Sequence, residues 1–186
     1  SDFKSCGDAG MYAILDNKGA YGDLANYARR GILLTNSRQT TVIQDEISFK
    51  NFESVVWIGH TAAEITLSAD SKTAYLTTYI GSRERTLRVA LLSDNRNLCF
   101  SVIPAGLEEK DFLLSHTNRP GYSEANGGLP EHDRSQFKRL IIRANTVKEF
   151  NVSVVLEMIG RNQEDAPLRY ERVPMSEWNP IIDDTN

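Results

Sequence analysis

The residues best suited to hold a ligand lie in one long polar connection, residues 106–136. This segment is rich in Gly, Pro, Asn, Glu and Asp, and a connection of that length inside one domain is often functional. It contains Arg119 and Tyr122 close together, with His116 just before them. A guanidinium group binds a carboxylate or sulfate through two hydrogen bonds, and an aromatic ring stacks on a sugar. We predict that Arg119, Tyr122 and His116 contact an acidic sugar; the alternative is that they are solvated loop residues.

No arrangement of residues typical of catalysis or metal binding is found. His60, His116 and His132 lack the spacing of metal ligands. His60 follows an apolar run and is interpreted as a hydrogen-bonded imidazole at a strand end. Asp45 and Glu46 are adjacent, so on a strand they point to opposite faces, and we interpret them as surface charges. A nucleophile elbow and a phosphate-binding glycine loop are also missing. We predict no catalytic residue, no metal and no cofactor in this chain.

Two other residue types have simpler explanations than ligand binding. Arg88 and Arg143 fall on strand faces expected to be wet, beside acidic residues, which favours cross-strand ion pairs. Cys99 lies in the apolar run Leu98–Phe100 and is interpreted as a small buried hydrophobic residue. With Cys6, it does not form the framework of a disulfide-rich protein.

The elements that would position these residues are β-strands, because apolar and polar residues alternate along most of the chain. The clearest case sets Phe150, Val152 and Val154 against Asn151 and Ser153. Strands are expected at 11–15, 27–34, 41–47, 55–58, 63–68, 74–80, 86–91, 98–102, 138–144 and 150–158. Clusters of turn-forming residues separate them, at the spacing of an antiparallel sandwich. We predict an all-β protein, an antiparallel β-sandwich of roughly ten or more strands.

The domain organisation and the charge narrow the class of protein. We expect one domain over residues 1–160 and a polar C-terminal extension, 161–186, that packs on it or trails from it. The net charge of −4 argues against a nucleic-acid partner, and no apolar run is long enough to span a membrane. The sequence begins without Met, so we expect a piece cut from a longer chain or one that has lost a targeting segment.

Several short motifs follow one another in an order that resembles the heparinase II/III-like family of polysaccharide lyases. In that family a strand with an Arg-Gly pair precedes a strand that ends in an Asp-Glu pair or a similar pair of acidic residues. The matching stretches are residues 20–22, Arg29-Arg30-Gly31-Ile32-Leu33-Leu34, Val42-Ile43-Gln44-Asp45-Glu46-Ile47, Trp57-Ile58-Gly59-His60-Thr61-Ala62-Ala63 and Arg119-Pro120-Gly121. They run from about Met11 to Met158, which is most of the chain.

The resemblance implies a parent enzyme with an N-terminal helical toroid followed by β-sandwich domains, which cleaves acidic polysaccharides by β-elimination. A base removes the C5 proton of a uronic acid while its carboxylate is neutralised, and an acid assists the leaving sugar. The family's main Tyr and His participants and its metal-binding residues lie before the segment that matches here. No catalytic residue of the family is therefore carried over onto this sequence.

We therefore expect a non-catalytic β-sandwich portion of a secreted or periplasmic lyase acting on uronate-containing polysaccharides such as glycosaminoglycans. Its partners would be the acidic polysaccharide and the catalytic α-toroid of the same parent chain. Any divalent metal would be bound elsewhere in the parent enzyme. If the domain is cut from such a parent, an exposed apolar face should promote self-association. The alternative is a free-standing carbohydrate-binding or adhesion module. A complete small enzyme is disfavoured, because no acid/base pair converges.

Overall fold

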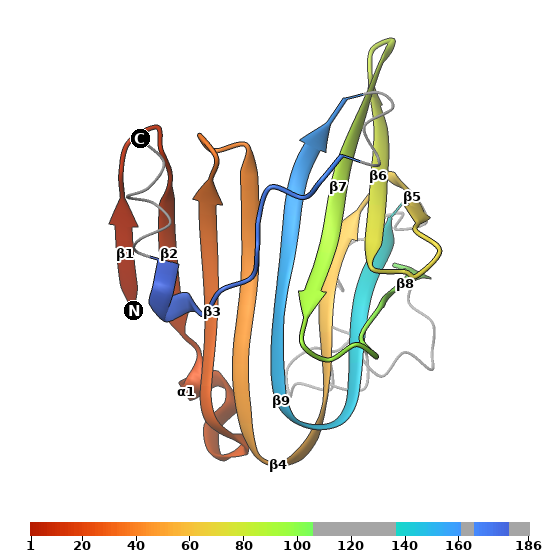
Figure 1. Ribbon diagram of the computed structural model, residues 1–186. Helices are drawn as coiled ribbons and strands as arrows, with labels where there is room; N and C mark the ends of the chain where they lie inside the picture. The colour runs from red at the N-terminus through yellow and green to blue at the C-terminus, as the bar shows by residue number, and fades with distance from the viewer. Residues whose placement is uncertain (106–136, 161–165, 179–186) are drawn as a thin grey trace, which may run out of the picture.

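The chain folds into one antiparallel sheet that bends back on itself (Figure 1). The computed structural model describes residues 1–105, 137–160 and 166–178. The strands are β1 (Asp2–Ser5), β2 (Met11–Asp16), β3 (Ala25–Thr35), β4 (Thr40–Thr61), β5 (Glu64–Leu67), β6 (Thr73–Ile80), β7 (Arg83–Ser93), β8 (Phe100–Pro104) and β9 (Lys138–Ile159). Short helical turns are α1 (Lys18–Tyr21), η1 (Gly22–Leu24) and η3 (Met175–Glu177). The all-β prediction is confirmed. Within the described ranges, no helix is long and apolar enough to cross a membrane.

The strand order is β1-β2-β3-β4-β9-β7-β6-β5, with β8 also paired to β9. The two central strands, β4 and β9, are each 22 residues long and pair along most of their length. The register shifts between Ser48 and Val55, opposite the stretch of β9 where Thr146 has a φ of 57°. Bulges of this kind bend strands. Residues 41–47 and 55–58, expected as two strands, are therefore one bent strand, and so are 138–144 and 150–158.

The bend creates two layers. The wide layer holds β1, β2, β3, the first half of β4, the second half of β9, β7, β6 and β5. The narrow layer holds the second half of β4, the first half of β9 and β8, and lies behind the wide one in Figure 1. The main core fills the space between them, with Trp57, Phe100, Ile142 and Phe150 among its largest buried side chains.

The C-terminal segment, residues 166–178, crosses the outer face of the wide layer (Figure 1). A second apolar cluster lies under it, where fully buried Trp178 packs with Met175, Leu33 and Val155. Gly31 of β3 is required here, because a Cβ at this position would come within 2.5 Å of the Trp178 ring. The segment therefore forms a partial third layer.

The interpretations of Arg88 and Cys99 are wrong because the covered face of each strand differs from the one expected. Arg88 pairs across strands with Glu157 as predicted, but its face is not wet: Arg88 is 5% exposed and Glu157 3%, beneath the C-terminal segment. Cys99 is exposed rather than buried, because Leu98 and Phe100 on either side of it point into the core.

The inner face of the wide layer extends beyond the narrow layer. On β1, β2 and β3 this face carries Phe3, Leu15 and Ile32, which are 66%, 45% and 42% exposed. Phe3 lies opposite Ala13, which in turn lies opposite Ile32, so these apolar side chains form a continuous row across three strands. We call this surface, residues Phe3, Ala13, Leu15 and Ile32, the apolar overhang.

Candidate functional site

The three residues predicted to contact sugar, Arg119, Tyr122 and His116, lie outside the residues that the structure describes, so they remain a prediction. His60 is described and lies exposed near the end of β4. Among the described residues, no group of three or more His, Cys, Asp or Glu side chains could hold a metal ion.

The motif residues of β3 and β4 meet side by side. Arg30 lies opposite Asp45 and donates two hydrogen bonds to it, from Nε to Oδ1 at 2.7 Å and from Nη2 to Oδ2 at 2.8 Å. The Asp45 side chain is only 6% exposed, so it is not the surface charge that the sequence suggested. Its hydrogen bonds raise the pKa of the Arg30 guanidinium. The pair is a structural clamp between the two strands.

The neighbouring acidic residue, Glu46, points to the other face and holds the C-terminal segment. Its Oε1 accepts a hydrogen bond from the Met175 backbone N–H at 2.9 Å. Fully buried Gln44 donates to the same Oε1 at 2.8 Å and to the Val173 carbonyl at 2.9 Å. Ser153 donates to Gln44 Oε1 at 2.6 Å. Buried polar groups of β4 and β9 thus fix the path of the segment across the sheet.

A second polar anchor holds the beginning of the segment. Arg88 donates to Glu157 and to the carbonyls of Ala166 and Pro167, the last at 3.2 Å. Glu157 also accepts from the Arg169 backbone N–H at 3.0 Å and from the Thr40 hydroxyl at 3.2 Å. Hydrogen bonds from the segment and from Thr40 therefore surround this buried ion pair, although the buried Arg88 Nε has no partner among the described residues.

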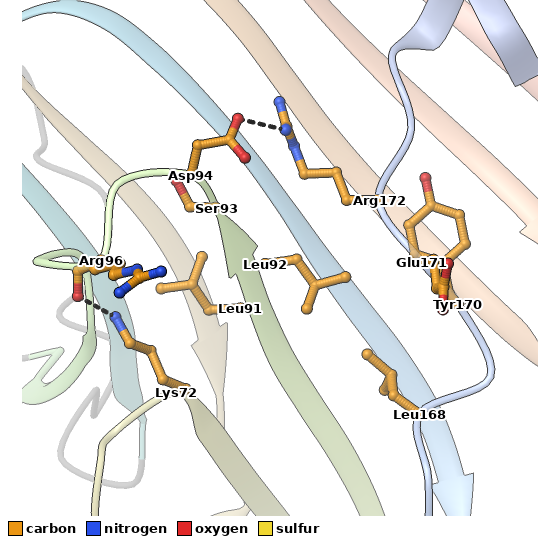
Figure 2. A pocket seen from close by; sticks show the side chains of 10 residues that line it. All are labelled: Lys72, Leu91, Leu92, Ser93, Asp94, Arg96, Leu168, Tyr170, Glu171 and Arg172. Carbon is orange, nitrogen blue, oxygen red and sulfur yellow. Dashed lines mark hydrogen bonds and ion pairs between the residues drawn. The ribbon is translucent and has the colours of Figure 1, made fainter.

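A pocket of about 700 Å³ opens where the anchored segment passes the end of β7 (Figure 2). This volume is within the range of about 300–1,000 Å³ usual for ligand sites. Its lining residues come from the β5–β6 turn, the end of β7, the turn that follows β7 and the C-terminal segment: Lys72, Leu91, Leu92, Ser93, Asp94, Arg96, Leu168, Tyr170, Glu171 and Arg172. Leu92 and Leu168 supply most of its apolar surface, because Leu91 is buried in the main core.

Some of the charged side chains around this pocket are already in ion pairs, and others are not. Arg172 and Asp94 form an ion pair at 2.8 Å across one end. The Lys72 ammonium donates to the carbonyls of Arg96, at 2.8 Å, and Leu98, and no described carboxylate pairs with it. Among the described residues, neither the Arg96 guanidinium nor the Glu171 carboxylate has an ion pair or a side-chain hydrogen bond. The pocket thus combines free charges of both signs with an apolar wall.

A smaller cleft of about 330 Å³ lies on the inner side, at the open end of the sandwich. Its walls are largely apolar and include Trp57, Leu76 and Leu156, with Arg30 and His60 at the margin. Because Arg30 is already paired with Asp45, this cleft offers less to a charged ligand than the pocket in Figure 2.

Sequence reasoning did not find the pocket in Figure 2. Arg96 lies in the connection between the strands expected at 86–91 and 98–102, and Glu171 lies in the expected polar extension, 161–186. The two come together because the C-terminal segment folds back over a strand about 80 positions earlier, as the hydrogen bonds from Arg88 show. No local spacing in the sequence carries that information.

No family model and no curated protein matches the chain. Solved structures that match include heparan sulfate lyase HepC from Pedobacter heparinus, with 9% identity and a TM-score of 0.56, over 83% of this chain and 20% of that one. A mutant of the same lyase matches with 10% identity and a TM-score of 0.54, with the same coverage. A heparinase III with methylated lysines matches with 12% identity and a TM-score of 0.56, over 87% of this chain and 21% of that one.

At identities of 9–12% these matches establish a shared fold. The chain spans about a fifth of the length of those lyases. Its fold therefore resembles one β part of a heparan sulfate lyase.

Proposed function

We propose that this chain is a non-catalytic β-sandwich domain of a heparinase II/III-like lyase, which cleaves acidic, uronate-containing polysaccharides by β-elimination. It supports a catalytic α-toroid of the same parent chain and contacts the polysaccharide. The parent acts outside the cytoplasm, in the periplasm or extracellular space, and any divalent metal is bound by the parent outside this portion.

The observation that carries the proposal is the fold match over more than four-fifths of this chain to one part of three lyase structures. The apolar overhang adds a physical reason. A row of large apolar side chains on a sheet face that the narrow layer leaves uncovered is typical of a surface that packs against another part of a protein. In this proposal the α-toroid covers Phe3, Leu15 and Ile32.

Self-association of the isolated chain tests this packing surface. We expect light scattering over a concentration series to show association, and Ile32→Ser to reduce it. Ile80→Ser is the matched control, because Ile80 is 68% exposed at the tip of the β6–β7 hairpin, away from the overhang. A wild-type chain that stays monomeric at high concentration, or an equal effect of both substitutions, would contradict the proposal.

An activity assay tests the non-catalytic role. The chain alone, mixed with heparin, heparan sulfate or alginate, should produce no unsaturated uronate absorbance. Turnover that persists after repeated purification would show that the chain is itself an enzyme. The reading frame that encodes these residues gives an independent check: several hundred helical residues upstream are expected.

The second candidate is a free-standing carbohydrate-binding or adhesion module. The pocket in Figure 2 favours it, because a charged pocket with an apolar wall suits a sugar without any catalytic partner. A reading frame without a helical segment, together with a monomeric chain, would favour this module over the lyase domain.

A further inference from the structure

We propose that the pocket between β7 and the C-terminal segment binds one acidic sugar residue, with its carboxylate or sulfate on Arg96 and Lys72 and its hydroxyls on Glu171. This inference rests on the proposed function, and it assigns the polysaccharide contact to a definite surface.

The anion side of the site is formed by the turn that follows β7. Arg96 is exposed and its guanidinium has no acidic partner among the described residues, so its donors are free for a carboxylate or sulfate. Figure 2 shows the guanidinium directed toward Leu91 inside the pocket. Lys72 lies beside it and spends two of its three N–H donors on backbone carbonyls, which leaves one for the ligand.

This side is also held in place before any ligand arrives. The Asn97 N–H donates to Asn95 Oδ1 at 3.0 Å, and the Leu98 N–H donates to the Asn95 carbonyl at 3.2 Å. Lys72 bonds to the same turn through the Arg96 carbonyl. A ligand therefore loses little affinity to ordering the backbone that carries Arg96.

The opposite wall carries the group that selects a sugar rather than a simple anion. Glu171, on the C-terminal segment, lies across the pocket from Lys72 and Arg96 in Figure 2 and has no cation partner among the described residues. A free carboxylate repels an inorganic anion but accepts hydrogen bonds from hydroxyl groups. A uronate or sulfated sugar has an anionic group at one edge and hydroxyls at the others.

The remaining surface suits the apolar face of a pyranose ring. Leu92 and Leu168 line the pocket between its two charged sides (Figure 2), while Leu91 at its edge is only 5% exposed. The Arg172–Asp94 ion pair closes one end and leaves those two charges engaged with each other. The free groups are then two cations on one wall and one carboxylate on the other.

Isothermal titration with a heparan sulfate tetrasaccharide tests the assignment, with amide chemical shifts locating the site near Ser93 and Leu168. An alginate tetrasaccharide distinguishes a carboxylate from a sulfate as the bound group. We expect Arg96→Gln to weaken tetrasaccharide binding by about tenfold to a hundredfold, as for the loss of one charge-assisted interaction. The matched control is Arg83→Gln, which removes the same charge from an exposed site on the β6–β7 hairpin and should change binding less than twofold.

Glu171→Gln separates a sugar site from a plain anion site. It should weaken tetrasaccharide binding and strengthen the binding of inorganic sulfate, because it removes a hydroxyl acceptor and a negative charge together. If it strengthens both, the pocket attracts anions without recognising a sugar, and the inference is wrong.

The inference is also wrong if Arg96→Gln and Arg83→Gln have equal effects on binding, or if neutral cellotetraose binds as well as the acidic sugars. These outcomes leave the proposed function standing, because association through the overhang and the lyase assay do not involve this pocket. Association that fails while the pocket binds sugar would instead remove the lyase-domain proposal alone.

Discussion

Replacement of Arg88 by Met should release the C-terminal segment from the sheet. Arg88 is 5% exposed and donates to Glu157 and to two carbonyls of the segment. The substitution leaves the Glu157 carboxylate buried with only the Thr40 hydroxyl and the Arg169 N–H as donors. Removing one partner of a buried pair costs about 3–5 kcal/mol. Because these two donors remain, we expect the lower end, about 3 kcal/mol.

Two measurements check this expectation. In a chain of this size a loss of about 3 kcal/mol lowers the midpoint of thermal unfolding by on the order of 10 °C. Trypsin should also cleave faster after Arg169 and Arg172, because the backbone of the released segment becomes accessible to the protease. Arg83→Met is the control, because Arg83 is exposed and has no side-chain partner in the described part of the chain, so its replacement should change stability by less than about 0.5 kcal/mol.

A double substitution separates the cost of the lone charge from the loss of packing. Arg88→Met combined with Glu157→Leu should recover part of the stability lost in Arg88→Met, because no buried carboxylate is left without its cation. A loss below about 1 kcal/mol in Arg88→Met, with unchanged cleavage at Arg169, would refute the view that this pair anchors the segment.

Three further substitutions probe the same architecture. Gly31→Ala should destabilise the chain by about 1–3 kcal/mol in urea unfolding, because its Cβ would collide with the Trp178 ring. Asp45→Asn should cost about 1–3 kcal/mol by weakening the clamp with Arg30, measured in the same way. Burial raises the pKa of the Tyr170 hydroxyl above its ordinary value of 10.0. The neutral hydroxyl therefore contributes fully to the free energy of unfolding below the pKa that Tyr170 has in the unfolded chain. That contribution is lost as pH rises through the folded-state pKa, and Tyr170→Phe should flatten the alkaline fall in unfolding free energy.

The sequence predicted the strands well because alternation is a local signal. The pattern of Phe150, Val152 and Val154 placed these residues in the core, where the structure has them. The Arg-Gly and Asp-Glu motifs pointed correctly to two consecutive strands, and the structure adds that Arg30 and Asp45 are direct cross-strand partners. What the sequence missed is the continuity of β4, because the exposed stretch Lys50–Phe52 at its bend has the polar character of a connection.

Alternation alone also cannot say what covers the polar face of a strand. Ser153 is fully buried, although it alternates with core residues and so was expected to face water, and it shares this covered face with fully buried Gln44. The covering segment, residues 166–178, was expected as part of a polar extension, because its apolar residues alternate irregularly with Arg and Glu. Five of them nevertheless pack on the sheet: Leu168, Tyr170, Val173, Met175 and Trp178. Its burial depends on hydrogen bonds to groups more than 100 positions away, such as that from Gln44 to Val173.

The same polar anchors connect the stability of the chain to the pocket in Figure 2. One wall of that pocket, with Leu168 and Glu171, belongs to the C-terminal segment, and the other, with Arg96, belongs to the turn after β7. The pocket therefore exists only while the segment is docked. A ligand that touches both walls binds the docked state alone and must stabilise it by mass action. An acidic tetrasaccharide should consequently slow tryptic cleavage after Arg169 in the wild-type chain, and it should lose that effect in Arg96→Gln, which keeps the segment docked but removes the anion contact.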